Sequence, residues 1–408
     1  MVVTIQQVLR PLLIMCFIIG LGAYPMKQSN PRIRWIAYLS ILYRLTIWFS
    51  YAYLLHYTIT FFTWKALFDT TINSIITTIN IITTIISVIM SFYHQKRFEI
   101  SLKKLSAVDN SLEELGVPMM YQRIHKYSKL VVIGWIAYSL SLNFLDTIGI
   151  LKYNEWTGLD NSWGLFLAHI LNYCFNINAF VDSLFTFFLW YICIRFDKLN
   201  EHIRYVLVRQ DHELRCTWKK SIVTHRHTLY TNYKKILWTS MHLHLELCRI
   251  ARELNSIFGI QITFEMTTCF IFITSLAYGI CMMLMQVLSK EISQSSYIWI
   301  NVCLSFFALL IRVYVVNYIC ESVMIKANEI NKIIYQIPSN TLLNTRQYAD
   351  ARKEIYQFTF QAMHHRLKLT GMNLFNLGNE CLQKFCITIV TFVIIMVQIE
   401  VNISPLSG

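Results

Sequence analysis

Seven apolar runs, each long enough to cross a bilayer as a helix, constrain this chain more than any other feature of its sequence. The hydrocarbon core of a membrane is about 30 Å thick, and a helix needs about 20 residues to cross it. The runs lie near residues 35–58, 70–93, 130–150, 163–192, 260–288, 297–320 and 385–400. Only 14% of the residues are charged, which is too few to cover a soluble surface. The sequence therefore predicts an all-α polytopic membrane protein with seven transmembrane helices.

The distribution of Lys and Arg predicts how these helices are oriented. Of the 36 Lys and Arg residues, 31 lie in the N-terminal segment and near residues 94–129, 194–256 and 321–384. Cytoplasmic connections keep the excess of positive charge. We therefore expect a cytoplasmic N-terminus and, after seven spans, an extracellular C-terminus. The net charge of +13 then faces anionic lipid at the cytoplasmic surface, and we expect no nucleic acid partner.

The order of apolar and charged segments divides the chain into parts. The run from Pro11 to Tyr24 is short and contains Pro and Gly, which predicts a re-entrant segment rather than a span. We expect a cytoplasmic helix over Gln347–Thr370 that ends at Gly371. The expected parts are a cytoplasmic N-terminal and re-entrant segment (1–34), transmembrane helices one to four (35–193), a cytoplasmic helical extension (194–259), helices five and six (260–320), cytoplasmic anchor helices (321–384), the last helix (385–400) and an extracellular tail (401–408).

Polar side chains recur at one depth in the outer half of several spans. On the second span they are three or four residues apart, which aligns them on one helix face. Two interpretations stay open: hydrogen bonding between helices, or a small-molecule pocket with apolar walls and a few polar anchors. The pocket candidates are Thr70, Asn73, Thr77, Asn143, Asp146, His169, Asn172, Asn176, Met282, Gln286, Asn301 and Ser305.

A second group of residues carries charge deep within the spans. Arg312 lies about 22 Å from the outer start of its helix, at a rise of 1.5 Å per residue. Charges at this depth need partners because lipid provides none. We expect a structural ion pair of Arg312 with Asp182 or Glu265, and this is favoured over a direct contact with a ligand.

The last span has one polar face in an otherwise apolar helix. Thr388, Thr391, Ile395 and Gln398 follow a three-and-four spacing along that face. Such a stripe could line a pore if several copies surround an axis. It could equally pack against other helices of the same chain.

Several short motifs resemble those of a known family. The run Thr391-Phe-Val-Ile-Ile-Met-Val-Gln398-Ile399 resembles the C-terminal signature of insect gustatory receptors, Thr-Tyr, five apolar residues and Gln-Phe. It has Phe and Ile where the family usually has Tyr and Phe. Further similar segments are Pro11-Leu-Leu with Gly22-Ala-Tyr-Pro25, Val108-Asp109-Asn-Ser-Leu112, Phe358-Thr-Phe-Gln361 and Gly371-Met-Asn-Leu-Phe375.

The resemblance implies a homo- or heterotetrameric ligand-gated cation channel in the plasma membrane of chemosensory neurons, on dendrite and soma. Its partners would be a small-molecule tastant, the lipid bilayer and permeant cations. The resemblance also implies that the last helix of each subunit lines the pore and that the ligand binds in the outer half of the subunit. Gln398 and Ile399 would form the outer constriction, Thr388, Thr391 and Ile395 the path below it, and Glu400 an outer acidic ring.

Other functions remain as alternatives. We expect a bitter plant compound as ligand because the C-terminal signature diverges, with a sugar sensor or an odorant receptor channel as alternatives. A G-protein-coupled receptor is the alternative of another class, and it predicts the opposite orientation. The chain lacks HExxH, GxSxG, P-loop and GxGxxG motifs, so we expect no enzyme, cofactor or metal site.

Overall fold

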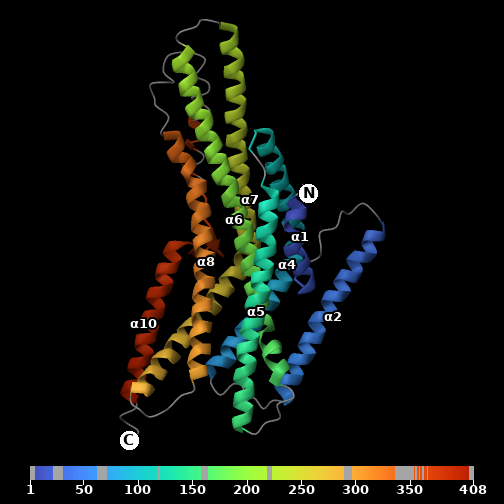
Figure 1. The fold of residues 1–408 in the computed structure, drawn as a ribbon, viewed down its shortest axis with the longest axis vertical. Coiled ribbons are helices and arrows are strands. Elements are labelled where there is room, and N and C mark those ends of the chain that lie inside the picture. The colour runs from blue at the N-terminus through green and yellow to red at the C-terminus, as the bar shows by residue number, and fades with distance from the viewer. Residues whose placement is uncertain are drawn as a thin grey trace.

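The computed structural model describes residues 5–21, 31–61, 71–117, 120–157, 164–217, 223–288, 296–335 and 366–403, with scattered residues between 353 and 364. These residues form an almost entirely helical bundle (Figure 1). Its elements are α1 (Ile5–Ile18), α2 (Pro31–Phe61), α4 (Thr71–Glu114), α5 (Tyr121–Thr157), α6 (Gly164–Thr217), α7 (Val223–Leu288), α8 (Ser296–Tyr335), β1 (Thr370–Gly371), β2 (Phe375–Asn376) and α10 (Asn379–Ile403).

Helix α6 lies at the centre of the bundle and contacts α2, α4, α5, α7 and α8. Buried positions make up 78% of its apolar stretch, compared with 6% in α10. A helix that is apolar on all sides is most stable when other helices surround it. Helices α2 and α10 lie on opposite flanks of the bundle (Figure 1). Few residues of α10 are therefore buried by packing within the chain, and its polar face stays exposed.

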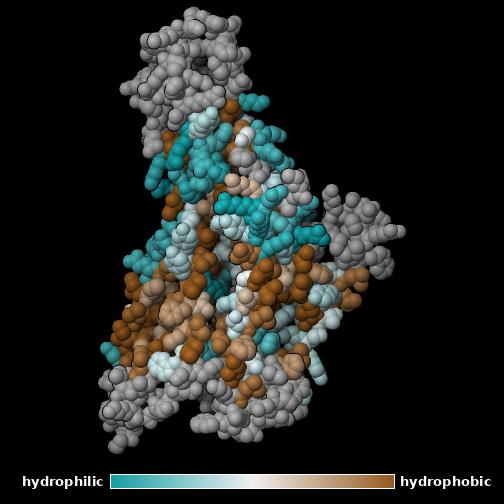
Figure 2. Space-filling view, viewed as in Figure 1, coloured by the Kyte–Doolittle hydropathy of each residue, from teal (hydrophilic) through white to brown (hydrophobic). Residues whose placement is uncertain are grey.

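Among the residues that the structure describes, six helices are long and apolar enough to cross a membrane, namely α4 to α8 and α10. The remaining predicted span, residues 35–58, coincides with α2, which is a continuous helix of 31 residues but is not among those six. Apolar side chains gather over the lower part of the molecule and hydrophilic ones above it, on the face that Figure 2 shows. This division matches a bundle that is partly immersed in lipid.

Two helices extend well beyond the length of a membrane span. Helix α6 has 54 residues and α7 has 66. At 1.5 Å per residue, α7 is about 100 Å long, roughly three times the thickness of the hydrocarbon core. The absence of Pro and Gly between residues 195 and 255 predicts such helical extensions, and α6 and α7 are helical in the described part of this segment.

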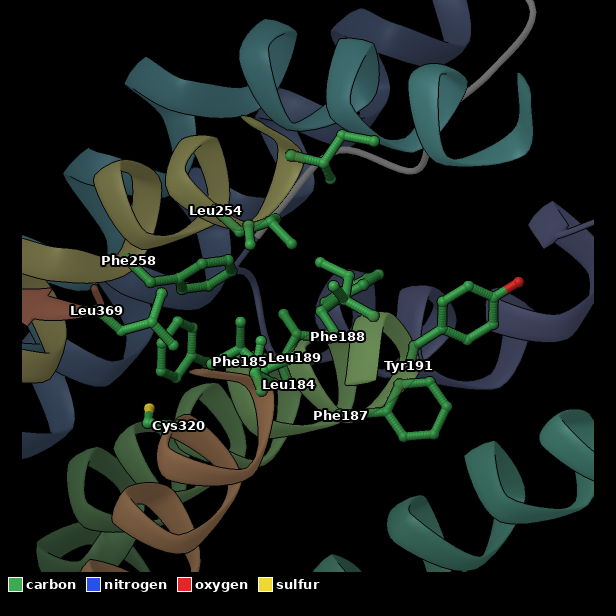
Figure 3. Packing of buried hydrophobic residues seen from close by; sticks show 14 of the residues in the cluster. Leu184, Phe185, Phe187, Phe188, Leu189, Tyr191, Leu254, Phe258, Cys320 and Leu369 are labelled. Atoms are coloured by element: carbon green, nitrogen blue, oxygen red, sulfur yellow. The ribbon is translucent and has the colours of Figure 1, made fainter. Parts of the chain in front are cut away.

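The core of the bundle is built from aromatic side chains of α6 and α7. Phe98 of α4 meets the Phe188 ring edge-on at a centroid distance of 5.1 Å, and Phe185 lies 5.6 Å from Phe258. Figure 3 shows these α6 and α7 side chains together with Leu369, which precedes β1 and is fully buried. The segment before β1 is therefore anchored in the same core as the long helices.

The N-terminal helix α1 is short, and its apolar face is buried. Val8 and Leu12 are fully enclosed, and α1 packs against α5, where the His125 ring lies 3.3 Å from the Val8 carbonyl oxygen. With 14 residues it is shorter than a bilayer-spanning helix. The re-entrant segment expected in this region thus corresponds to a helix that is part of the folded core.

The region before the last helix differs from the expectation. We expected a helix up to Thr370, but residues 366–369 are not helical and Thr370 begins a β-hairpin. Thr370 pairs with Asn376 and Gly371 with Phe375 in antiparallel register. Met372 and Asn373 in the turn have positive φ angles of 49° and 60°. Left-handed residues such as these are typical of tight hairpin turns. Because Gly371 pairs with Phe375 and residues 366–369 are not helical, Gly371 belongs to the hairpin and does not end a helix.

Gly371 is required for space rather than for backbone conformation, which gives a testable prediction. A Cβ atom there would lie 2.6 Å from Phe375 Cζ and 2.7 Å from Thr263 Oγ1 of α7. Gly371→Ala should therefore lower the stability of the folded protein by about 1–3 kcal/mol, because the hairpin must move away from α7. Thermal unfolding of the detergent-solubilised protein, followed by size-exclusion chromatography, measures this effect.

Gly134→Ala on α5 is the matched control, since a Cβ atom there meets nothing within 4 Å. It should leave the melting temperature unchanged or raise it, because Ala is the better helix former. Equal melting temperatures for Gly371→Ala and the wild type would contradict the packing described for the hairpin.

Candidate functional site

One carboxylate in the bundle joins three helices. Asn172 of α6 donates its Nδ2 to Asp146 Oδ2 of α5 at 2.6 Å, and Asn301 of α8 donates its Nδ2 to Asp146 Oδ1 at 3.3 Å. All three residues are half-buried. Hydrogen bonds to a charged acceptor are the stronger kind, so this Asp146 cluster holds α5, α6 and α8 together at one depth. The sequence analysis named all three residues as pocket candidates.

The other pocket candidates lie in varied surroundings. Asn143 and Asn176 are buried, and Trp135 Nε1 donates to the Asn176 main-chain oxygen at 2.9 Å. Thr77, Met282 and Ser305 are half-buried, whereas His169 is exposed. Thr70 and the side chains of Asn73 and Gln286 lie outside the described residues. A ligand pocket around the Asp146 cluster therefore stays a prediction.

An aromatic cluster lies between α2 and α6, and its α6 member, Tyr173, directly follows Asn172 of the Asp146 cluster. Tyr173 packs on Tyr51 at a centroid distance of 4.8 Å and on Trp48 at 6.0 Å. Tyr51 also donates its hydroxyl to the Ile170 carbonyl at 3.3 Å. Because successive residues on a helix point about 100° apart, Tyr173 faces α2 while Asn172 faces α5 and α8.

Arg312 is enclosed between two carboxylates. Its Nε lies 2.7 Å from Asp182 Oδ2 of α6, and its Nη2 lies 2.6 Å from Glu265 Oε1 of α7. The side chains of all three residues are at least nine-tenths buried. The guanidinium also lies over the Phe175 ring at 5.2 Å. The sequence offered Asp182 and Glu265 as alternative partners, and the structure gives Arg312 contacts with both.

The polar stripe of the last helix is exposed on the single chain. Thr388, Thr391, Ile395, Gln398 and Ile399 all point away from the rest of the subunit. Helix α10 packs on the bundle through the buried Ile389, and the Phe270 ring of α7 meets Phe385 at 5.5 Å and Phe392 at 6.0 Å. The side chain of Glu400 lies outside the described residues. The stripe is therefore available to another chain or to water.

The first turns of α10 carry a neutralised positive charge. Lys384 Nζ lies 2.6 Å from Glu380 Oε1, one helical turn before it, and both side chains are exposed. Lys384 also belongs to the spacing of the polar stripe. Its pairing with Glu380 reduces the repulsion that an isolated Lys would exert on a nearby cation.

A buried ionic network was missed by sequence reasoning. Arg195 Nε of α6 lies 2.8 Å from Asp109 Oδ1 of α4, and Tyr191 donates its hydroxyl to Asp109 Oδ2. Asp109 follows Leu105 and Val108 and precedes Leu112, so it lies on the apolar stripe of its helix. A charged residue on such a stripe is the sequence signal that could have identified this buried pair.

The structure also contains a cavity of ≈80 Å³ that the sequence did not predict. It lies between α1, α4, α6 and α7, and its polar lining includes Ser87, His94, Gln95 and Gln261. Ser87, His94 and Gln95 belong to α4 and Gln261 to α7, so only tertiary packing brings them together. The polar spacing of the second span includes Ser87, but no sequence pattern linked it to Gln261.

The long apolar helices and the deeply buried charge cluster are typical of a polytopic membrane protein. Its last helix has a polar face that is exposed on the single chain. A sequence model for the family described as 7tm Chemosensory receptor matches residues 9–403. The chain therefore belongs to the 7tm chemosensory receptor family, which is a family of membrane receptors and not of enzymes.

Individual relatives agree with this family. The chain is 23% identical over 336 residues to "Putative gustatory receptor 28b" of Drosophila melanogaster, covering 78% of this chain and 67% of that one. It superposes on the insect olfactory receptor OR5 from Machilis hrabei with a TM-score of 0.61, and on the same receptor in complex with eugenol with a TM-score of 0.58. Both structures are 15% identical and cover 96% of this chain and 97% of theirs. The shared fold thus extends over nearly the whole length.

The buried charge cluster gives a second testable prediction. Arg312→Met leaves Asp182 and Glu265 without their cation, and removing one partner of a buried ion pair costs about 3–5 kcal/mol. We expect a large loss of folded protein on size-exclusion chromatography. The triple variant Arg312→Met, Asp182→Asn, Glu265→Gln should recover most of that loss, because no unpaired charge remains.

Arg249→Met serves as control, because Arg249 forms ion pairs with Glu246 and Glu253 at the surface and is 63% exposed. Exposed pairs contribute about 0–1 kcal/mol, so its melting temperature should stay near that of the wild type. If Arg312→Met were no less stable than Arg249→Met, the cluster would have no structural role.

Proposed function

We propose that the chain is a subunit of a ligand-gated, non-selective cation channel that responds to a small-molecule tastant. The exposed polar stripe of α10 is the observation that carries this proposal. A face with Thr388, Thr391 and Gln398 gains little from contact with lipid, whereas it can contact water in a pore. One helix cannot enclose a pore, so several copies must surround a common axis.

We propose a homo- or heterotetramer, as the resemblance to gustatory receptors implies. The burial of Ile389 supports this arrangement, because Ile389 lies on a different side of α10 from the stripe and attaches that side to the bundle, while the stripe stays exposed. Gln398 and Ile399 would form the outer constriction, with Thr388, Thr391 and Ile395 lining the path below. Glu400 would add an acidic ring that concentrates cations.

The proposed ligand site surrounds the Asp146 cluster. A ligand opens a channel only if it binds the open arrangement more tightly than the closed one. Asp146 joins α5 and α6 to α8, so a ligand that changes its hydrogen bonds to Asn172 or Asn301 changes how these helices pack. The half-buried Met282 and Trp299 add apolar surface to the polar anchors. We propose a bitter plant compound as ligand, with a sugar as the alternative.

The relatives support a small-molecule receptor. The Drosophila relative is named as a gustatory receptor, and one Machilis structure holds eugenol, a small aromatic molecule. At 15% identity the Machilis structures support the fold only, so the ligand of this chain must be identified by a screen. An odorant receptor channel remains the alternative within the same family.

The orientation separates this proposal from a G-protein-coupled receptor, and it gives the third prediction. We propose that the protein crosses the plasma membrane of chemosensory neurons with a cytoplasmic N-terminus and an extracellular C-terminus, as its Lys and Arg distribution indicates. In unpermeabilised cells an antibody should stain a C-terminal tag and not an N-terminal tag. Permeabilised cells control for expression of both proteins, and the reverse staining pattern would rule out the proposed orientation.

The pore assignment gives the fourth prediction. Cells that express the chain should show reversible, ligand-evoked cation current, or should do so once a co-subunit is added. Gln398→Ala should change the relative permeability to calcium and sodium by a factor of about two or more, because it alters the narrowest polar ring. Reversal potentials in whole-cell recordings measure this change.

Val390→Ala is the matched control on the same helix. Val390 is 58% exposed but lies off the polar stripe, so its removal should leave ion selectivity as in the wild type. An ion selectivity that is the same in the wild type, Gln398→Ala and Val390→Ala would show that Gln398 does not line the conduction path.

A further inference from the structure

The ≈80 Å³ cavity between α1, α4, α6 and α7 is separate from the Asp146 cluster. On α6 it is lined by Val181, which is nine residues beyond Asn172 and so about 14 Å further along the helix. On α1 it is lined by Cys16, so the N-terminal helix closes one side of it. The cavity therefore lies at a second depth of the bundle and depends on a helix that does not touch the proposed ligand site.

One polar group in this cavity lacks a partner. Gln261 of α7 is 6% exposed, and its Nε2 is enclosed without a hydrogen-bond acceptor in the part of the chain that the structure describes. A buried amide without an acceptor destabilises the folded state, and a bound acceptor removes that cost. The two hydroxyls in the lining, Ser87 and Ser91, donate to the Thr83 and Leu21 carbonyls, and neither hydroxyl oxygen accepts a hydrogen bond from Gln261 Nε2. The cavity therefore offers a hydrogen-bond donor, Gln261 Nε2, to a bound molecule.

The remaining lining excludes a charged guest. The lining residues that the structure describes include no Asp, Glu, Lys or Arg, and most are apolar, with Met90 as an adaptable side chain. A charge transferred into such surroundings would be costly. A volume of ≈80 Å³ accommodates about five to eight heavy atoms, at roughly 10–15 Å³ for each water-sized position. A sugar carries a hydroxyl group on most of its carbon atoms, which this mostly apolar lining does not match.

We propose that this cavity is a second binding site, which takes a small uncharged amphiphile with an apolar body and one hydrogen-bond acceptor. An alcohol, ether or ketone of this size places its oxygen at Gln261 Nε2 and its carbon chain beside Met90 and Cys16. The bound molecule satisfies the buried amide and fills the space under α1. The site needs neither the pore nor the Asp146 cluster, so it can be tested independently of the proposed channel function.

Photolabelling of the full-length protein in lipid nanodiscs tests this site. The probe is a pentanol that carries a diazirine on its chain, and mass spectrometry locates the labelled residues after irradiation. We expect saturable labelling of α1, α4 or α7 residues that line the cavity, with competition by unlabelled pentanol. Gln261→Leu should reduce this labelling about fivefold, since one hydrogen bond contributes about 1 kcal/mol.

Two neighbouring residues on α4 provide a filling variant and its control. Met90→Trp should fill the cavity and reduce the labelling at least as much as Gln261→Leu does. Ile89→Trp should retain it, because Ile89 is 58% exposed and does not line the cavity. Size-exclusion chromatography selects folded protein, so a failure of one variant to fold leaves the other to decide.

Labelling of folded protein that is unchanged by either variant, or that occurs only at exposed positions of the helices, would overturn the proposal. Both results would mean that the probe partitions into lipid. Silence of the channel in electrical recordings would leave this test unaffected, because photolabelling reports binding directly.

Discussion

The contacts of Arg312 with Asp182 and Glu265 fix the centre of the bundle. They join α8 to α6 and α7 at a depth where neither water nor lipid can satisfy a charge. Apolar packing between helices leaves some freedom to slide or rotate, because lipid tails are as apolar as leucine side chains. A buried guanidinium between two carboxylates removes that freedom, since any displacement leaves a charge without a partner. The positions of α6, α7 and α8 relative to one another therefore depend on this cluster.

Helix α8 connects this cluster to the last helix. Asn317 Oδ1 accepts a hydrogen bond from the Gly378 main-chain nitrogen at 2.9 Å, and Glu321 Oε2 accepts one from Asn379 at 3.1 Å. Both bonds hold the first residues of α10, just after the hairpin that packs against Thr263 of α7. Near its other end, α8 carries Asn301, which contacts Asp146. Helix α8 therefore connects the Asp146 cluster to the start of α10.

Polar groups in the bundle are satisfied in three different ways. Some form ion pairs inside the subunit, as do Asp109 and Arg195 between α4 and α6. Others, such as Gln261, are enclosed but lack a partner in the described part of the chain, which favours a bound molecule. On α10, the Thr388 and Thr391 hydroxyls donate to main-chain oxygens of their own helix, yet the stripe is exposed on the single chain, which favours the proposed contact with a pore. Burying a polar group without a partner is unfavourable. Depending on where the group lies, its partner is another residue of the subunit, a bound molecule, or water and neighbouring subunits.

The sequence by itself determined the features that depend on local periodicity. The lengths of the apolar runs, the unbroken helices α6 and α7, the polar stripe of α10 and the need of Arg312 for a partner all follow from residue type and spacing along one helix. Which side chains meet across helices was decided by the tertiary structure. Arg312 contacts two carboxylates rather than one, Tyr173 faces α2, and Gly371 lies in a hairpin packed against Thr263. These contacts depend on the rotation and crossing of helices far apart in the chain, which no single helical pattern encodes.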